Sequence, residues 1–207
     1  NAFAIAPDAN SPAIPVMCEF FAGYFFVCLR NSRTIRWSNL EDPTTWDLLD
    51  VFERSWAPDN INFIKRNGTH IWVVGTQTSE VLYATGGIDV FAPAQESLIE
   101  HGSIARFAGQ LMPQGVTTLD QDARGGIQVV QFRGLQPDAI STYAINLEQA
   151  SQAGILNASY AFVLQMEGHV WYLLNNRNPD NTFRLTPVYD ATEGGWHHWA
   201  HWDPNPP

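Results

Sequence analysis

Lysine is almost absent from this sequence, and charged residues of every kind are scarce. Only Lys65 among the 11 basic residues is a lysine, while 21 residues are acidic, so the formal net charge is −10. Proteins that bind nucleic acids generally present a basic patch, and this balance therefore argues against a general nucleic-acid binder. Charged residues make up 15% and hydrophobic residues 45% of the 207 positions, which excludes an intrinsically disordered chain.

Cysteine and long apolar runs are scarce as well. The chain has only Cys18 and Cys28, far fewer cysteines than a disulfide-rich secreted scaffold. A bridge between them would fit a secreted scaffold, but cysteine is among the most often buried residues, and we expect two buried thiols. No apolar run reaches the roughly 18 residues of a membrane-spanning helix, so we expect no membrane among the partners.

Short apolar runs that follow a glycine recur along the chain, at Gly23, Gly68, Gly109 and Gly168. Each run is rich in β-branched and aromatic residues, which predicts a strand. A second such run follows each of them, at residues 33–38, 79–84, 126–132 and 186–190. Residues 42–46 and 193–197 combine a turn with a tryptophan, and we expect them to close the first and last repeats. Repeats of 40–50 residues that hold several short strands each are typical of a β-propeller, and the longer last gap also contains a predicted helix.

One helix is predicted, at residues 142–153, with Ser141 or Thr142 as its N-cap and Gly154 as its terminator. We therefore expect an all-β, propeller-like fold of about four blade-like units with one short helix. A β-sandwich of the same strands is the alternative. Four units are few for a closed propeller, so we expect an incomplete propeller that is part of a longer chain. The expected organisation is an extended segment at 1–19, a propeller-like domain at 20–203 and a proline-rich end at 204–207.

The most ligand-like cluster is His197, His198 and His201, interleaved with tryptophans. Histidines four residues apart on a helix can share a zinc ion, but the flanking glycines and proline argue against a helix here. On a strand, His197 and His201 face one way and His198 the other. At most two ligands would then share a face, so we predict half-exposed histidines on a blade-edge strand and no metal.

Acidic pairs occur at residues 41 and 42, 47 and 50, and 120 and 122. Paired carboxylates could serve glycoside hydrolysis or calcium binding. Residues 120–125 resemble the start of a calcium loop, but Arg124 stands at a ligand position, so we expect a solvated hairpin turn. Residues 38–46 resemble the Asp-box turn of sialidase propellers, but they differ at the aspartate and tryptophan positions and predict a plain hairpin turn. We therefore expect no catalytic residue, no cofactor and no metal: the chain is not predicted to be an enzyme.

Several segments together resemble one protein family. Residues 31–47 (NSRTIRWSNLEDPTTWD) are similar to the stretch NRF-x-x-S-x-L-x-D-x-TTWD of the phage packaged-DNA stabilisation proteins, which form the tail nozzle or hub of short-tailed phages. Further segments agree in the same order: 78–86 (TSEVLYATG), 99–105 (IEHGSIA), 140–145 (ISTYAI), 167–173 (EGHVWYL) and 188–197 (VYDATEGGWH). The resemblance covers roughly residues 20–203. The chain departs from the family's pattern at residues 184–187 and 198–199.

The resemblance implies a propeller-like structural protein of the virion tail, assembled in the host cytoplasm and without catalytic residues. It implies a ring of identical subunits, usually a hexamer, below the portal and its adaptor. Such a ring closes the channel, retains packaged DNA and passes double-stranded DNA during ejection. Phosphates are bound chiefly by Lys and Arg, so an acidic chain fits a lumen through which DNA slides without specific binding. We expect acidic side chains to line that lumen.

Two other classes of function remain open at this point. A carbohydrate-binding or glycan-active propeller would use surface tryptophans as sugar platforms and would be monomeric. A generic secreted scaffold would carry a bridge between Cys18 and Cys28. The oligomeric state separates the nozzle protein from the glycan-binding propeller, and a free-thiol titration tests the scaffold.

Overall fold

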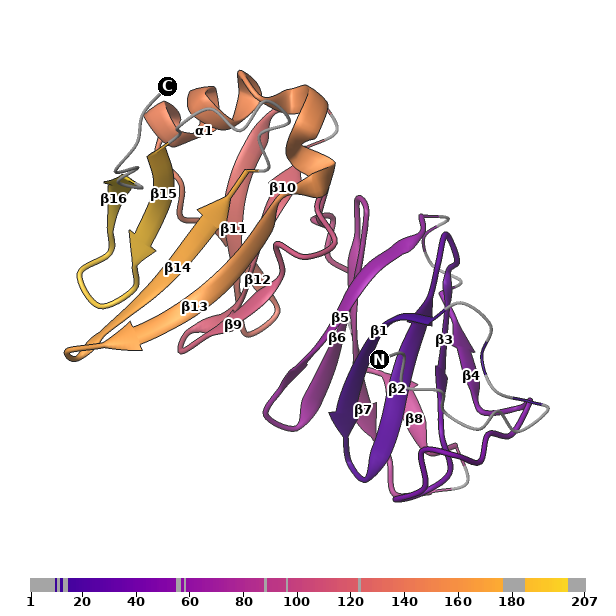
Figure 1. Ribbon diagram of the computed structural model, residues 1–207. Coiled ribbons are helices and arrows are strands. Elements are labelled where there is room, and N and C mark those ends of the chain that lie inside the picture. The colour runs from indigo at the N-terminus through magenta and orange to yellow at the C-terminus, as the bar shows by residue number, and fades with distance from the viewer. Residues whose placement is uncertain are drawn as a thin grey trace, which may run out of the picture. The chain divides into compact units, whose positions relative to one another are not determined.

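The computed structural model describes residues 10, 12, 15–54, 57, 59–87, 89–95, 97–122, 124–176 and 185–200. The chain divides into two compact units, residues 1–100 and 101–207. Each unit contains two four-stranded antiparallel sheets, whose strands are hydrogen-bonded in the order in which they follow along the chain (Figure 1).

The first unit holds the first two sheets. The first sheet consists of β1 (Pro15–Phe21), β2 (Tyr24–Leu29), β3 (Thr34–Trp37) and β4 (Val51–Glu53). The second sheet consists of β5 (Ile61–Asn67), β6 (His70–Gly75), β7 (Ser79–Ala84) and β8 (Phe91–Pro93).

One apolar core lies between these two sheets. Phe91 of β8 contacts Phe26 of β2 and Trp37 of β3, with ring centroids 4.7 and 5.2 Å apart. The first strands of the two sheets, β1 and β5, lie beside each other. The backbone N–H of Arg66 on β5 donates a hydrogen bond of 2.9 Å to Oε1 of Glu19 on β1. The sheets therefore pack through their faces and also adjoin through their first strands.

A fully buried arginine also links these sheets. Arg54 directly follows β4, and its Nε donates to Oε1 of Glu80 on β7 at 3.0 Å. Its Nη1 donates to Oδ1 of Asp59 at 2.9 Å, and its Nη2 donates to the hydroxyl of Thr78. Burial by itself would raise the pKa of Asp59, but the backbone amide of Gln77 and the charge of Arg54 outweigh it and lower that pKa. Each nitrogen of the buried guanidinium thus has a polar partner, which offsets the cost of its desolvation.

The second unit holds the other two sheets and both helices. The third sheet consists of β9 (Gln110–Met112), β10 (Gly115–Gln121), β11 (Ile127–Arg133) and β12 (Gln136–Ala139). The fourth sheet consists of β13 (Tyr160–Met166), β14 (His169–Asn175), β15 (Leu185–Asp190) and β16 (Gly195–Ala200). Along the chain, helix α1 (Tyr143–Ala150) and a 3₁₀ helix (Ala153–Ala158) connect the third sheet to the fourth.

The second core resembles the first in its construction. The buried Tyr172 of β14 donates a hydrogen bond of 2.8 Å from its hydroxyl to the carbonyl of Ala108. The backbone N–H of Ala161 on β13 donates to the carbonyl of Phe107, and Nε2 of Gln110 on β9 donates to the carbonyl of Ala161. The first strands β9 and β13 therefore adjoin, as β1 and β5 do in the first unit.

Helix α1 confirms the predicted helix and selects between its two candidate caps. The hydroxyl of Thr142 accepts a hydrogen bond from the backbone N–H of Ile145, whereas the hydroxyl of Ser141 accepts one from Val129. Thr142 is therefore the N-cap. The helix ends at Ala150, before the predicted end at residue 153, because Ser151 takes the C-cap position and the chain tightens into the 3₁₀ helix.

Tight turns with positive φ precede three of the predicted strands, as the sequence indicated. Gly23, Gly68 and Gly168 have φ values of 88°, 58° and 83° and lead into β2, β6 and β14. The prediction was wrong for the third repeat, where the run after Gly109 forms the first strand of its sheet. The equivalent glycine is Gly115, which begins β10. A Cβ on Gly115 would lie 1.9 Å from the carbonyl oxygen of Phe132, so this position has no room for a side chain.

Each sheet is an up-and-down meander of four strands, which is the architecture of a propeller blade. The four predicted second runs form the third strands β3, β7, β11 and β15. The all-β prediction of four blade-like units with one short helix is thus confirmed. A sandwich would join strands of different repeats into common sheets, whereas each repeat here forms a sheet of its own.

The predicted domain boundaries agree with the structure only in part. β1 begins at Pro15, inside the expected N-terminal segment 1–19, because residues from Pro15 to Phe21 pair with β2. Residues 201–207, which include the proline-rich end, lie outside the described residues. The assignment of 20–203 to one domain stays a prediction. Within the described ranges, no helix is long and apolar enough to cross a membrane.

Candidate functional site

One face of the fourth sheet is apolar and faces away from the core of its unit. We call it the β13 face; it is formed by Tyr160, Phe162, Leu164 and Met166 of β13, Trp171 of β14 and Trp199 of β16. Side chains alternate between the two faces of a strand, so the intervening residues Ala161 and Val163 face the core. The sequence of β13 therefore gives this sheet two apolar faces.

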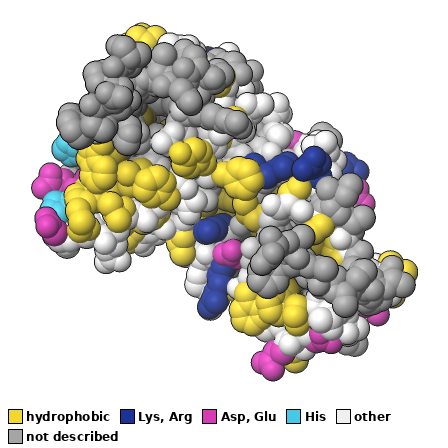
Figure 2. Space-filling view, in the orientation of Figure 1, with side chains coloured by type: hydrophobic (Ala, Val, Ile, Leu, Met, Phe, Trp, Pro, Cys, Tyr) yellow, Lys and Arg dark blue, Asp and Glu magenta, His cyan; other side chains and the backbone are white. Residues whose placement is uncertain are grey.

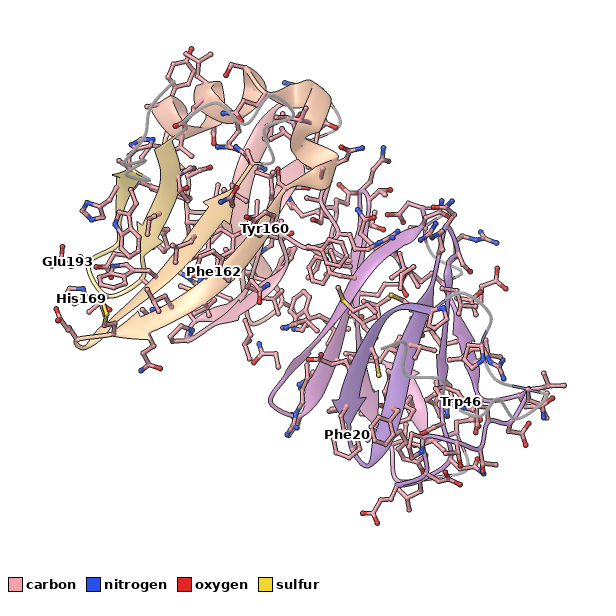
Figure 3. All side chains as sticks on the ribbon, in the orientation of Figure 1. Phe20, Trp46, Tyr160, Phe162, His169 and Glu193 are labelled. Atoms are coloured by element: carbon pink, nitrogen blue, oxygen red, sulfur yellow. The ribbon has the colours of Figure 1, made fainter. Side chains whose placement is uncertain are left out.

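The β13 face is accessible to solvent along its first strand. Phe162 and Met166 are 44% and 47% exposed, whereas Ala161 between them is buried. Figure 3 shows Tyr160 and Phe162 along β13, and Figure 2 shows hydrophobic side chains gathered over this sheet.

Two tryptophans on this face pack against each other. The indole of Trp171 lies edge-on to that of Trp199, with ring centroids 5.1 Å apart. On its other side Trp171 stacks on the imidazole of His169, at 5.5 Å and an interplanar angle of 15°. These contacts restrict both indoles, so little side-chain freedom would be lost if a partner covered them.

A histidine–aspartate pair lies at one end of the β13 face. Nδ1 of His169 and Oδ2 of Asp190 are 2.6 Å apart, and Oδ1 of Asp190 accepts hydrogen bonds from the backbone N–H groups of Thr192 and Glu193. Burial by itself would raise the pKa of Asp190, but the Thr192 amide and His169 outweigh it and lower that pKa to about 2. Asp190 is therefore ionised at neutral pH and holds the β15–β16 turn.

His169, Asp190 and Glu193 form a cluster of potential metal ligands, whose ligand atoms lie within 4.8 Å of one another (Figure 3). However, both oxygens of Asp190 already accept hydrogen bonds. His101 and Asp120 form a similar pair at 2.6 Å in the third sheet. The repetition of the pair in two sheets indicates a structural role, in which a buried carboxylate anchors a loop.

The predicted histidine cluster is not brought together in the part of the chain that the structure describes. His197 and His198 are neighbours on β16 and therefore point to opposite faces, as predicted. Nε2 of His198 lies 2.8 Å from Oε2 of Glu148 on α1. His201 lies outside the described residues. The tryptophan of this segment that reaches the core is Trp196, whose Nε1 donates to the carbonyl of Ile140.

The acidic segment between β3 and β4 forms a hydrogen-bonded turn. Oδ1 of Asp42 accepts from the backbone N–H and hydroxyl of Thr44, and its Oδ2 accepts from the hydroxyl of Thr45. These hydrogen bonds lower the pKa of Asp42 to about 2, and the bond from the hydroxyl of Thr44 contributes most. The expectation that residues 42–46 close the first repeat was wrong, because the last strand of this sheet, β4, begins only at Val51. Trp46 is instead buried, with its Nε1 donating to the carbonyl of Pro43.

The second acidic segment differs from the expected solvated turn. Asp122 does cap the β10–β11 turn, since its Oδ1 accepts from the backbone N–H groups of Arg124 and Gly126. Asp120 is instead buried, and its carboxylate is held by His101 and by the backbone N–H of Gly102. The two carboxylates therefore have separate structural partners.

The two cysteines form no disulfide and lie on different sides of the first sheet. Cys28 is buried in the first core, as predicted, but Cys18 is exposed on β1. Cys18 lies opposite Val27, and Cys28 lies opposite Met17 in the neighbouring residue pair. Side chains of neighbouring pairs point to opposite faces of the sheet, so the two thiols do as well. Alternation along β1 and β2 thus explains why only one thiol is buried.

The side of the first sheet that faces away from its core is also apolar, with Cys18 and Phe20 exposed and Val27 buried. We call it the β1 face; it is formed by Cys18, Phe20, Phe25 and Val27. Phe20 is 46% exposed, and its ring centroid lies 4.9 Å from that of Phe25. Like the β13 face, this face points away from the core of its own unit.

The first strands that carry these two faces were missed in the sequence. β13 follows a clear alternation, with apolar residues at 160, 162, 164 and 166. That period of two would have identified a strand with a second apolar face. Most of β1 lies in the segment 1–19, for which an extended conformation outside the domain was expected.

The chain was compared with curated proteins, with solved structures and with models of protein families. No curated protein matches the chain. Among solved structures, it is similar to the N-terminal domain of Nup159, with 8% identity, a TM-score of 0.47, and coverage of 92% of this chain and 48% of that one. It is also similar to the WD40 domain of SCAP from fission yeast, with 12% identity, a TM-score of 0.49, and coverage of 92% and 43%. The chain thus spans less than half the length of both structures.

A family model gives the decisive comparison. Residues 3–197 match the phage stabilisation family, described as bacteriophage P22 Gp10, beta-propeller. This match confirms the family that the ordered segments between residues 31 and 197 indicated, and its description agrees with the four blade-like sheets. The chain therefore belongs to the bacteriophage P22 Gp10 family of β-propeller, packaged-DNA stabilisation proteins.

Proposed function

We propose that this chain is a structural component of the phage virion, located in the tail nozzle or hub. There it forms part of a ring of identical subunits, six in number, below the portal and its adaptor. The ring closes the channel so that packaged DNA stays in the head, and it opens a path for that DNA during ejection. The observation that carries this proposal is the family match over residues 3–197.

The charge of the chain supports a role beside DNA without tight binding. Arginines are the main cations, and several of them are paired with acids: Arg33 with Glu53 at 2.7 Å, and Arg133 with Asp138 at 3.1 Å. Arg54 is buried between carboxylates. Affinity for DNA comes mainly from cations that neutralise phosphates, so paired arginines and a net charge of −10 favour sliding over holding.

A phage that lacks this protein tests the proposal directly. We expect heads that fill with DNA and then lose it, measured as a fall in DNase-protected DNA per head while capsid assembly stays normal. Wild-type particles should contain the protein at a constant number of copies per tail. Mutant heads that keep their DNA, or purified virions without the protein, would contradict the proposal.

Binding measurements separate the nozzle protein from a glycan-binding propeller. We expect no retention of double-stranded DNA at about 0.15 M salt and no binding of oligosaccharides by the purified protein. Specific oligosaccharide binding by a monomer would support the carbohydrate-binding function instead.

A further inference from the structure

The loop between β3 and β4 presents two adjacent leucines to water. Leu48 and Leu49 are 64% and 85% exposed, and Leu49 is the most exposed large apolar side chain in the described part of the chain. We call residues 47–50, with the sequence DLLD, the leucine loop. Exposed apolar side chains that lie together, rather than singly, indicate an interaction site.

Hydrogen bonds hold the leucine loop in one conformation. Oδ1 of Asp47 accepts the backbone N–H of Leu49 at 2.9 Å, and the carbonyl of Asp47 accepts the backbone N–H of Asp50 at 3.2 Å. Nη2 of Arg36 on β3 donates to the same carbonyl at 2.8 Å. The buried Trp46 directly precedes the loop (Figure 3). Because the backbone is already ordered, a partner would lose little free energy in ordering it.

A hollow of about 300 Å³ lies beside the leucines. It is lined by Asn10, Asn39, Thr45, Trp46, Asp47 and Leu48. These residues carry amide, hydroxyl and carboxylate groups together with one indole. Carboxylate and amide oxygens accept hydrogen bonds from a guanidinium or ammonium group, and an indole attracts a cation. The hollow therefore suits the end of a lysine or arginine side chain.

The sequence around the leucine loop is acidic. Residues 38–53 contain no lysine or arginine and five acidic residues, which are Glu41, Asp42, Asp47, Asp50 and Glu53. Burial and the charge of Asp47 raise the pKa of Asp50, although Arg36 opposes them. A cation supplied by a partner would relieve the repulsion between these carboxylates, so the loop is complementary to a basic surface.

We propose that the leucine loop binds a different protein, whose surface offers an apolar pocket for Leu48 and Leu49 bordered by lysine or arginine. One of these basic side chains enters the hollow beside Leu48. A second copy of this chain fits poorly, because its net charge is −10 and Lys65 and Arg66 are its only adjacent pair of basic residues. An anionic lipid surface would repel the carboxylates of the loop.

This inference rests on the proposed function, which brings the chain into contact with other proteins of the virion. The probe for its test is a preparation of heads from a phage that lacks this protein. Purified protein is mixed with these heads, and the bound fraction is measured by cosedimentation. We expect Leu49→Ser to bind at least about 10-fold more weakly than the wild type. Leu147→Ser is the matched control, because Leu147 is 58% exposed on α1, and it should bind as the wild type does.

A charge substitution tests the basic border of the pocket. Asp47→Asn removes a charge and keeps an oxygen that can accept the N–H of Leu49. We expect it to bind the heads more weakly and to lose less affinity than the wild type when salt rises from about 0.05 to 0.5 M. The control Glu167→Gln, in the exposed β13–β14 turn, should keep the wild-type salt dependence. Unchanged affinity and salt dependence in Asp47→Asn would overturn the basic partner.

Thiol labelling locates the contact in the particle. Leu49→Cys is combined with Cys18→Ser, since Cys18 is exposed and would react as well. We expect the new thiol to react with a maleimide in the free protein and to be protected in the virion. Protection in the free protein would overturn the proposal in favour of a cover from the same polypeptide. Equal reaction in virions that contain the protein would refute the contact alone, whereas purified virions without the protein would refute the proposed function.

Discussion

The guanidinium of Arg54 occupies the space that a side chain at Gly75 would need. A Cβ on Gly75 would lie 2.1 Å from Nη1 of Arg54 and 2.2 Å from Oδ2 of Asp59. The end of β6 thus leaves room for a buried charge that contacts β7 and the loop before β5. The absence of a side chain at one position determines how two blade-like sheets are joined.

Gly75→Ala should therefore be strongly destabilising. The new methyl group would displace the guanidinium from its carboxylate partners inside the core, and disrupted buried ion pairs typically cost about 3–5 kcal/mol. We expect the free energy of unfolding in urea to fall by this amount. Gly87→Ala is the control, because Gly87 has only Thr85 within 4 Å and ordinary φ. Equal stability of the two variants would show that the arginine can move without cost.

Acid stability should depend on Asp190. Its pKa is about 2 in the folded protein and near 4 in an unfolded chain, so its contribution is fully present above pH 4 and is lost as the pH falls through 2. A pKa lowered from near 4 to about 2 corresponds to at most about 2.5 kcal/mol, reduced by solvent screening. In Asp190→Asn the unfolding free energy should be lower at pH 7 and should change less between pH 4 and 2. Glu193→Gln should keep the wild-type slope, and a wild-type slope in Asp190→Asn would refute this role.

The free cysteines give a chemical test of the first sheet. We expect one thiol per native chain and two per unfolded chain to react with an alkylating reagent, because Cys18 is exposed and Cys28 buried. Partial burial and the charge of Glu19 raise the pKa of Cys18, so its reaction should accelerate as the pH is raised above 9. Cys18→Ser should leave no native thiol reactive. Two thiols that react only after reduction would indicate a bridge.

Zinc should not stabilise the protein. Both carboxylate oxygens of Asp190 accept hydrogen bonds, so an ion bound directly by Asp190 would compete with His169 and the Thr192 amide for them. We expect the melting temperature to be the same with and without Zn²⁺. A rise of several degrees that disappears in His169→Gln would identify a metal site.

Much of the fold could be predicted from the residues alone. The glycines at 23, 68 and 168 marked hairpin turns, because positive φ is accessible to glycine at little cost. The helix was recognised from its N-cap region. The first strands were less evident, since β1 begins with a proline and β5 contains the charged residues Lys65 and Arg66.

The candidate site was less predictable, because it depends on which face of a strand lies against a core. Trp46 and Trp171 look alike in the sequence, but Trp46 is buried in a loop and Trp171 lies on an outer sheet face. Asp120 looked like a turn residue and is buried against His101. Such differences arise from residues distant in the sequence, which local patterns do not encode.

The sequence by itself determined the class of the protein: its repeated apolar runs specify strands, its glycines specify the turns between them, and its ordered motifs specify the family. Only the tertiary structure decided which faces of those strands are covered. Alternation along β13 supplies apolar residues to both faces, but burial of one face requires the neighbouring sheet to pack against it. The exposed state of Phe162 follows from that packing.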